Sequence, residues 1–475
     1  MSKNKLRNIF IGTLVFYIIF VVSFFYLSGE QLKYKESPNN MELVEADSIT
    51  DEINEKTSAV QSFTNTVDKI ESMEIVFTKF YKDTAKGLVT IRLYDDDVVL
   101  FRETINIKDI PEQHRVTLYP DAKAENLKNK RLSLEITSNA KAGQGVGIMM
   151  RKEGASALSF VKVGNNNINA TLCFALKGVD IIPASDYYWA ITGGVGLLLA
   201  GLLFTSYRQY IKGHINYLVL ALLAIERYKF LISQLVIRDF KSKYKRSVFG
   251  VFWSFLNPLL TMTVQFLVFS TFFKADTKNY PVYLLCGVVC FSFFSECTSM
   301  CLTSISGNSR LITKVYIPKY IFPLSRTISS AVNLAISLVP LFLACLVLGI
   351  VIRPQALLFF YFLTCLVVFS LGVGMFLSAL MVFFRDIQFL WTVLIQIWNY
   401  ATPIFYPAEI VPDKYKFILR FNPLYHFIGN ARKCLMDGIS PEPMAYINCF
   451  LFAFGSLLIG AYVFKKTQDK FALYV

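Results

Sequence analysis

A block of basic side chains in the middle of the chain stops abruptly where an uncharged, apolar run begins. That run extends from Ser247 to Phe273 without a charged residue. Ammonium and guanidinium groups in this position could bind the phosphate groups of an anionic ligand or contact a second protein. Anchoring of the chain to anionic lipid explains them equally well. The residues that we single out in the block are Arg238, Asp239, Lys243, Tyr244 and Arg246.

The apolar run is long enough to cross a membrane. As a helix, residues 248–273 would be about 39 Å long, against about 30 Å for the hydrocarbon core of a bilayer. The basic block must then lie at one face of the membrane. Because Lys and Arg accumulate on the cytoplasmic side of membrane proteins, we place that face in the cytoplasm.

The composition is typical of a membrane protein, since 54% of the 475 residues are hydrophobic and 17% are charged. The net charge of +14 would also fit nucleic-acid binding. However, Glu30–Ser185 carries 20 Lys and Arg against 23 Asp and Glu. Most of the positive excess therefore lies in segments that we predict to be cytoplasmic, where anionic lipid accounts for it. We expect no nucleic-acid partner.

The cysteines do not suggest a disulfide framework, because eight of the nine lie in the membrane half and Cys173 is alone in the hydrophilic region. Four of them share one helical face, but the outer two would be about 22 Å apart, too far to share one ion. We expect a stripe of small residues for helix packing and no metal site. The four are Cys286, Cys290, Cys297 and Cys301.

The first half of the chain is predicted to cross the membrane twice around an external domain. Residues 1–29 read as a cytoplasmic tip and an uncleaved membrane anchor, because their uncharged run is too long for a secretory signal. Residues 30–185 have the composition of a soluble domain, and residues 186–206 return the chain to the cytoplasm as a second span.

The external domain is predicted to be a β-sandwich, and a jelly roll is one arrangement compatible with its strand spacing. Short alternating runs separated by turn residues indicate its strands, whereas Gln31–Val60 is acidic and reads as a linker. The expected strands are Ile75–Tyr81, Leu88–Tyr94, Val98–Ile105, Val116–Tyr119, Leu132–Thr137, Val146–Met150, Leu158–Val163 and Ala170–Leu176.

Residues 207–247 are predicted to hold an amphipathic helix that ends in the basic block. Glu226, Arg227 and Lys229 interrupt its apolar sequence. The two cations alone would disfavour a membrane-spanning position by about 5–7 kcal/mol. We therefore place this helix along the cytoplasmic interface.

Residues 248–475 are predicted to form a core of six spans, which makes the chain an α-helical polytopic membrane protein with about eight transmembrane helices. Both termini then lie inside the cell. An external segment, residues 407–444, reads as two short helices broken at Asn422-Pro423 and at Gly438. The six spans are Val248–Phe273, Pro281–Thr303, Phe322–Val351, Ala356–Phe383, Phe389–Tyr406 and Ala445–Phe464.

Four stretches of this core carry a family resemblance. They are LVIRDFKSKYKRSVFGVFWSFLNPLL, SGNSRLITKVYIPKYIFP, FFRDIQFLWTVLIQIWNYATPIFYP and FNPLYHFIGNARKCLMDG. In this order they resemble the transmembrane subunit of ABC-2 type exporters of cell-surface polysaccharides, the O-antigen and teichoic-acid exporter permeases. The first 206 residues are not part of the usual pattern.

The resemblance implies a homodimeric permease in the cytoplasmic membrane of a bacterium. Its partners would be two copies of an ATP-binding subunit, membrane lipids and a lipid-linked glycan. ATP and Mg²⁺ would bind to the ATPase subunit, so we expect no cofactor and no catalytic residue on this chain. The phosphate-binding pattern G-x-x-x-x-G-K-[ST] is absent from the sequence.

A short cytoplasmic helix is expected to couple ATP hydrolysis to the membrane, with Asn308 as its cap and Pro318 as its end. An ordinary loop with topology-setting cations is the simpler alternative. The basic block would contact the ATPase or guide a lipid-diphosphate head group, and Asn422 and Pro423 would belong to an external gate. The coupling residues are Asn308, Leu311, Lys314, Tyr316 and Pro318.

Aromatic side chains could hold the apolar faces of sugars while a polymer slides past, although belt positions at the membrane interface are the default for such residues. Glu296 is a charge within a predicted span, which indicates either function or a position close to the inner interface. The candidate channel aromatics are Phe252, Trp253, Trp391, Trp398, Phe405 and Tyr406.

Two alternatives to an exporter remain at this point. A membrane glycosyltransferase would need clustered carboxylates at a membrane face, and the acidic residues outside the β-domain are few and scattered. A cell-envelope scaffold or sensor with an external glycan-binding domain would not need six further spans. The external domain itself is expected to bind or pass on the glycan, or to recruit a cell-wall partner.

Overall fold

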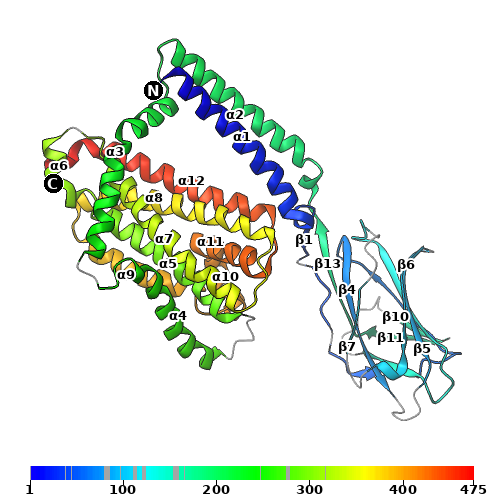
Figure 1. Cartoon of the computed structure of the whole chain (residues 1–475). Helices are drawn as coiled ribbons and strands as arrows, with labels where there is room; N and C mark the ends of the chain where they lie inside the picture. The colour runs from blue at the N-terminus through cyan, green and yellow to red at the C-terminus, as the bar shows by residue number, and fades with distance from the viewer. Residues whose placement is uncertain are drawn as a thin grey trace. The chain divides into compact units, whose positions relative to one another are not determined.

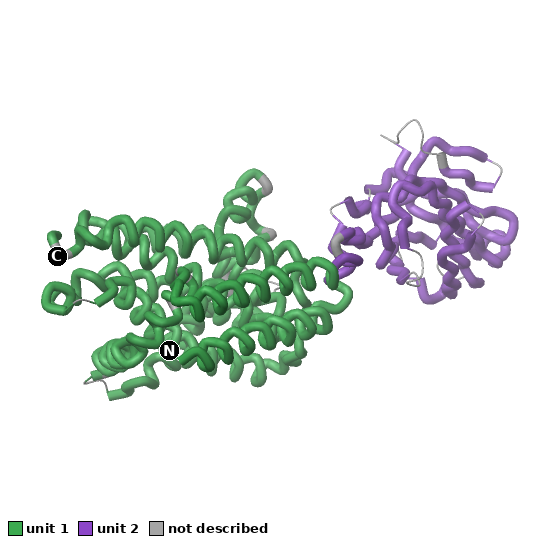
Figure 2. Tube along the Cα trace, turned by 90° about the horizontal axis from the view of Figure 1, so that it is seen from above, with its two compact units in different colours: residues 1–31, 188–475 green, residues 32–187 purple. Residues whose placement is uncertain are grey.

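The computed structural model describes residues 2–37, 39–43, 45–79, 86–96, 98–110, 115–119, 125–152, 160–164, 166–245, 248–273, 279–315 and 317–474. These residues form two compact units. One unit combines Met1–Gln31 with Tyr188–Val475, and the other is Leu32–Tyr187 (Figure 2).

The Leu32–Tyr187 unit consists of two antiparallel sheets. One sheet has the order β1-β13-β4-β9-β12, with β2 beside β9 and β7 beside β4, and the other has the order β11-β10-β3-β8-β5-β6 (Figure 1). The strands are β1 (Tyr34–Glu36), β2 (Ser48–Ile49), β3 (Ala59–Thr64), β4 (Lys69–Lys79), β5 (Leu88–Asp95), β6 (Val98–Asn106), β7 (Arg115–Leu118), β8 (Arg131–Ser138), β9 (Val146–Arg151), β10 (Phe160–Val163), β11 (Asn166–Asn169), β12 (Thr171–Leu172) and β13 (Phe174–Ile181).

Alternating side chains build the core between these sheets. Successive residues of a strand point to opposite faces, so every second position can be apolar and buried. Phe77 and Ile148 from one sheet and Ile91 and Leu134 from the other are completely buried in one apolar cluster. The predicted two-sheet β region is thus confirmed.

The expected linker Gln31–Val60 is wrong, because it contains β1 and β2 and the start of β3. In β3 the inward position between Ala59 and Phe63 is occupied by Gln61, which is buried and interrupts the apolar alternation. Its Oε1 accepts a hydrogen bond from the Leu172 N–H at 2.8 Å. The hydrogen bond of Gln61 is formed inside the core, and its polar side chain breaks the apolar pattern from which a strand would be predicted.

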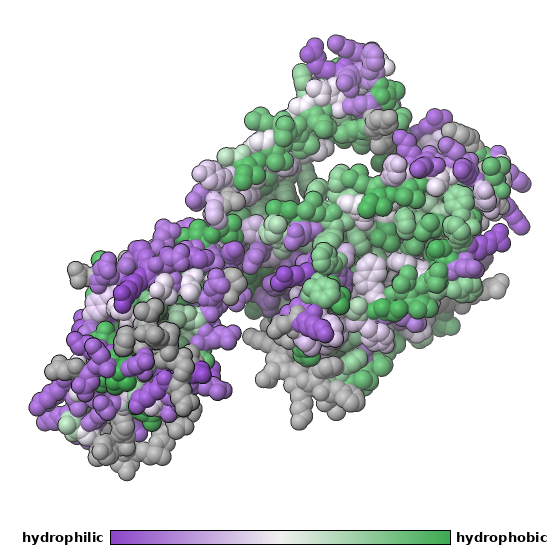
Figure 3. All heavy atoms as spheres, turned by 180° about the vertical axis from the view of Figure 1, so that it is seen from behind, coloured by the Kyte–Doolittle hydropathy of each residue, from purple (hydrophilic) through white to green (hydrophobic). Residues whose placement is uncertain are grey.

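The other unit is helical, and seven of its described helical segments are long and apolar enough to cross a membrane. On the face shown in Figure 3, hydrophobic side chains cover broad stretches of this unit, and hydrophilic ones gather in separate groups. The helices are α1 (Lys3–Ser28), α2 (Tyr188–Ile211), α3 (Tyr217–Tyr244), α4 (Phe252–Phe273), α5 (Tyr280–Leu302), α6 (Ser309–Lys314), α7 (Ile321–Val347), α8 (Phe359–Phe383), α9 (Ile387–Ala401), α10 (Asp413–Phe421), α11 (Pro423–Arg432), α12 (Pro443–Thr467) and α13 (Phe471–Tyr474).

Helix α3, which we predict to lie along the interface, is not among the seven candidate spans. It contacts α2 and α7, and its Glu226 forms an ion pair with Lys5 of α1. This ion pair gives a partner to the acidic residue among the charges that interrupt the apolar sequence of α3.

The predicted span Phe389–Tyr406 is shorter than expected. Helix α9 has 15 residues and is therefore about 22 Å long, less than the thickness of a bilayer core. It ends at Ala401 because Pro403 pushes the preceding Thr402 into an extended conformation. The carbonyl groups that follow are bound by side chains of α5 and α11, so irregular backbone is tolerated there.

Helices α8 and α12 pack at close range through two glycines. A Cβ atom added to Gly460 would lie 2.1 Å from the Gly372 carbonyl oxygen, and one added to Gly372 would lie 2.4 Å from the Leu457 nitrogen. Glycine at both positions lets the two backbones approach each other, as small residues do in membrane helix pairs.

Replacing Gly460 by valine should separate α8 from α12. The added side chain overlaps backbone rather than a movable side chain, so we expect a destabilisation of at least about 1–3 kcal/mol. Size-exclusion chromatography and thermal unfolding in detergent would measure the loss of folded protein. Gly455→Val is the matched control, because a Cβ atom there meets nothing within 4 Å. Equal behaviour of the two variants would contradict the packing argument.

Candidate functional site

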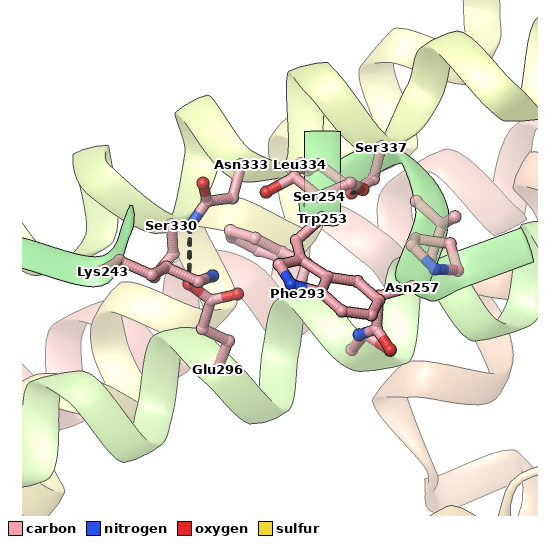
Figure 4. Close-up of a pocket in the computed structure, with 13 residues that line it drawn as sticks. Lys243, Trp253, Ser254, Asn257, Phe293, Glu296, Ser330, Asn333, Leu334 and Ser337 are labelled. Carbon is pink, nitrogen blue, oxygen red and sulfur yellow. Dashed lines mark hydrogen bonds and ion pairs between the residues drawn. The ribbon is translucent and has the colours of Figure 1, made fainter. Parts of the chain in front are cut away.

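A polar cavity of about 440 Å³ lies between α4, α5 and α7 near the end of α3 (Figure 4). Its wall is largely apolar, and charged, amide and hydroxyl groups project from it beside aromatic side chains. The residues around it include Lys243, Trp253, Ser254, Asn257, Phe293, Glu296, Ser330, Asn333 and Ser337.

Glu296 of α5 is the central polar group of this cavity. Its Oε1 accepts hydrogen bonds from Lys243 Nζ at 2.8 Å and from Asn333 Nδ2 at 2.7 Å, and both donors face it in Figure 4. A charge within a membrane helix is expensive unless it is paired, so these partners explain how Glu296 is retained there.

A second cavity of about 590 Å³ shares Lys243 and Glu296 with the first. Its lining adds Arg238 and Asp239 of α3 and Arg326 of α7. The two cavities therefore form one polar region, with cationic side chains on the side of α3. We call it the polar cleft.

Proline and serine shape the α4 wall of the polar cleft. Pro258 lies inside α4, where proline cannot donate a hydrogen bond to the carbonyl four residues earlier. That carbonyl belongs to Ser254, and it accepts a hydrogen bond from Ser337 Oγ of α7 at 3.1 Å. The carbonyl that Pro258 leaves free in α4 is thus bound by a side chain of another helix.

Asp239 fastens α3 to the bundle. Its side chain is 3% exposed and lies 3.0 Å from Nη2 of Arg238 and 3.0 Å from Nη1 of Arg326. Arg238 Nη1 also donates to Asn308 Oδ1 at 3.1 Å. One carboxylate and two guanidinium groups therefore join α3 and α7 to the segment that precedes α6.

The predicted coupling segment does contain a short helix, α6, but two details of the prediction are wrong. Asn308 occupies the N-cap position without capping α6, because its side chain donates to the Ser304 carbonyl at 2.7 Å and accepts from Arg238. Pro318 does not end the helix, since α6 already ends at Lys314. Leu311 packs partly buried against a neighbouring apolar cluster, and Lys314 is exposed.

Comparison with known proteins indicates the family of the helical unit. Residues 231–436 match the ABC-2 type transporter family. This part of the chain belongs to the ABC-2 type transporter family. Family members are membrane permeases that work with ATPase subunits and are not themselves catalytic.

Several transport permeases are similar to this chain. It is 29% identical over 240 residues to the O-antigen export system permease protein RfbA of Klebsiella pneumoniae, covering 50% of this chain and 91% of the relative. It is 27% identical over 252 residues to RfbA of Myxococcus xanthus, covering 52% and 95%. Identity to the polysialic acid transport protein KpsM of Escherichia coli is 21% over 249 residues, covering 51% and 95%.

The candidate channel aromatics of the ABC-2 permease fall into two groups. Phe252 and Trp253 are partly exposed on α4, and Trp253 lines the polar cleft. The tryptophans of α9 instead pack into the bundle, where Trp391 Nε1 donates to Thr298 Oγ1 at 3.2 Å and the two indole rings lie 6.4 Å apart. Phe405 is buried, and Tyr406 is half-buried and donates its hydroxyl to the Tyr400 carbonyl at 2.8 Å.

The predicted external helices are α10 and α11, and Asn422 is the junction between them. Its Oδ1 accepts from Trp398 Nε1 at 2.9 Å and from the Leu424 N–H at 3.1 Å, which caps α11, while its Nδ2 donates to Thr402 Oγ1 at 2.9 Å. Pro423 begins α11, and Gly438 follows the π-helical turn Lys433–Asp437 in a left-handed conformation (φ 62°).

Arg432 is a structural cation to which the sequence analysis assigned no role. It is buried and donates to the carbonyls of Tyr283, Pro403 and Ile404 at 2.8–3.1 Å. Its guanidinium also lies 3.4 Å from the centre of the Tyr283 ring. Arg432 thus ties α11 to α5 and to the irregular backbone after α9.

The polar face of α7 was also missed, although its signal is present in the sequence. Arg326, Ser330, Asn333 and Ser337 are spaced by four, three and four residues, which places them on one side of a helix. All four line the polar cleft. Tyr316 and Arg246 lie outside the described residues, and the side chain of Tyr244 is not described.

Substituting Asp239 by asparagine should loosen α3 from α7. Loss of a buried ion-pair partner usually destabilises by 3–5 kcal/mol, and we expect roughly 2–3 kcal/mol here because Arg238 is half exposed. Thermal unfolding of the purified permease would measure the effect. Asp386→Asn, at an exposed position before α9, is the control. An unchanged melting temperature for Asp239→Asn would refute the anchoring role.

Proposed function

We propose that this permease exports a cell-surface polysaccharide, delivered on a lipid carrier, across the cytoplasmic membrane of a bacterium. The similarity to O-antigen and polysialic acid transporters over 91–95% of their length supports a polysaccharide as the substrate class. An O-antigen, a capsular glycan or a teichoic-acid-like polymer is compatible with this proposal.

The observation that carries the proposal is the polar cleft. Arg238, Lys243 and Arg326 line it with cations that suit the phosphate groups of a lipid-linked head group. Glu296 and Asn333 provide a carboxylate and an amide for hydroxyl groups, and Trp253 offers an aromatic face for a sugar ring. Charged side chains inside a membrane helix bundle are costly, and they commonly mark the site of a polar ligand.

The basic end of α3 faces the cytoplasm in this proposal, so the polar cleft accepts its ligand from the inner side of the membrane. The Leu32–Tyr187 unit, α10 and α11 then lie on the outer side. The N- and C-termini are both cytoplasmic.

Two copies of a separate ATPase subunit drive transport by binding to the segment around α6, with ATP and Mg²⁺ held on that subunit. A displacement of α6 reaches α3 through Asn308 and Arg238, and reaches α7 through Asp239 and Arg326. Since α3 and α7 both line the polar cleft, the same contacts couple the ATPase to the ligand site.

A second copy of this chain completes the channel in this proposal. Phe252 and Trp253 of α4 would line it together with their counterparts in the other copy, while the α9 tryptophans hold the wall in shape. The few scattered carboxylates of the helical unit and the family match favour the permease over a glycosyltransferase, and the cleft favours it over a scaffold or sensor.

Replacing Lys243 by glutamine should reduce export. The substitution removes the ammonium group beside Glu296 and one cation of the polar cleft, so we expect at least a tenfold fall in surface polysaccharide. The variant would be expressed in the producing bacterium in place of the native chain. Surface glycan and intracellular lipid-linked glycan would then be quantified separately.

Lys241→Gln is the matched control for this test, because Lys241 is exposed two residues earlier on α3 and lines neither cavity. Intracellular accumulation with Lys243→Gln and normal export with Lys241→Gln is the expected result. Equal export by the two variants would remove the role of the polar cleft.

A further inference from the structure

The outer face of the six-stranded sheet in the Leu32–Tyr187 unit carries polar side chains that line up in rows across the strands. Its inward positions, such as Ile91, Leu134 and Val161, are buried in the core. The residues between them therefore project from the other face of the sheet. The strand register shows which of these outward residues lie opposite one another on neighbouring strands.

One row crosses five strands. Lys162 of β10 is opposite Val60 of β3, Val60 is opposite Glu135 of β8, Glu135 is opposite Arg92 of β5, and Arg92 is opposite Arg102 of β6. With about 4.8 Å between strands, the row is about 19 Å long. That length suits an extended polymer of several sugar units.

Glu135, Arg92 and Tyr94 form a fixed group at the centre of this face. Glu135 Oε2 accepts from Arg92 Nη1 at 3.3 Å and from the Tyr94 hydroxyl at 2.8 Å. The side chains of Arg92 and Glu135 are 30% and 26% exposed, so they remain accessible. A guanidinium, a carboxylate and a phenol held together can bind adjacent sugar hydroxyls and stack against a ring.

Hydroxyl groups surround this centre. Ser62 and Ser133 lie 2.9 Å apart through their Oγ atoms, and Thr90 and Thr104 lie 3.2 Å apart through their Oγ1 atoms. Three apolar side chains, Val60, Leu88 and Val99, also lie at outward register positions of these strands. The surface is consistent with a hydroxyl-rich ligand.

The net charge of this face differs from that of the whole unit. Its described outward positions include four cationic side chains, Arg92, Arg102, Arg131 and Lys162, against the one carboxylate of Glu135. Glu30–Ser185 as a whole carries 20 basic and 23 acidic residues. Positive charge is therefore concentrated on this face of a unit that is negatively charged overall.

We propose that the outer face of the six-stranded sheet, centred on Arg92, Tyr94 and Glu135, binds a polysaccharide that carries carboxylate or phosphate groups. The cations attract the repeating negative charges, and the central group binds sugar hydroxyls. That this ligand is the exported polymer itself rests on the proposed function. The binding property of the face does not.

Binding to full-length protein in detergent micelles tests the proposal, with three soluble probes compared by isothermal titration calorimetry. Polygalacturonate carries carboxylates, poly(glycerol phosphate) carries phosphates, and dextran is neutral. We expect binding to at least one anionic probe, weakened by salt, and at least tenfold weaker binding to dextran.

The double variant R92Q/R102Q should reduce affinity for the anionic probe at least tenfold. Lys177→Gln, on β13 of the other sheet, is the control and should bind as the native chain does. A thermal unfolding curve for each variant shows that the fold is retained, and Arg92→Lys with native Arg102 should keep part of the affinity.

Binding that is equal for the double variant and the control would overturn the proposal, as would equal binding to dextran or no binding to either anionic probe.

Export is measured separately as surface polysaccharide in the producing bacterium. If R92Q/R102Q abolishes binding while the polymer still reaches the surface, the binding face stands and the permease function is unaffected. If the anionic probe binds but loss of the whole chain leaves surface polysaccharide unchanged, the proposed function falls and the binding face stands.

Discussion

A single buried carboxylate determines how the basic end of this bundle is assembled. Asp239 is almost inaccessible to solvent, and ionised carboxylates are retained in such places only when opposite charges surround them. Arg238 and Arg326 supply those charges from α3 and α7. This constraint fixes α3 against the bundle and thereby brings Lys243, at the end of α3, within 2.8 Å of Glu296.

The polar cleft is a consequence of that constraint together with the sequence of α7. A stripe of arginine, serine and asparagine on α7 meets Glu296 of α5 and the proline-interrupted turn of α4, so each polar group finds a partner from another helix. The same contacts extend to Asn308 beside α6. The proposed ligand site and the proposed coupling segment therefore share one network, which is the arrangement that an ATP-driven permease needs.

The seven long helices and the two-sheet unit were predictable because their signals are repeated over many residues. The break at Asn422-Pro423 was also predictable, since proline at the first helical position and an asparagine cap act within one turn. Contacts between segments that are distant in the sequence could not be predicted. In the sequence, Gln61 interrupts the apolar alternation, and only the fold shows that β12 donates a hydrogen bond to it. The position of Asn308 predicts a helix cap, but in the fold its side-chain oxygen accepts a hydrogen bond from Arg238 instead.

The contacts of the aromatic residues could not be predicted from the sequence either. Trp391 and Trp398 share a helical face, which the sequence shows, but only the fold shows that α5 and Asn422 occupy that face. The stripe on α7, in contrast, could have been found from spacing alone. Apart from Arg326, its members are small or amide side chains within a strongly apolar helix, and such a pattern is missed when only charges and aromatic residues are sought.

Site-specific photo-crosslinking in the producing bacterium tests the central claim most directly, namely that the polar cleft holds the glycan. A photoreactive amino acid at Asn257 would project into the cleft, whereas one at Val264 would lie on an exposed part of α4 outside it. Irradiation should attach glycan to the permease at position 257 and not at position 264. Glycan attached equally at the two positions, or none at position 257, would contradict the account.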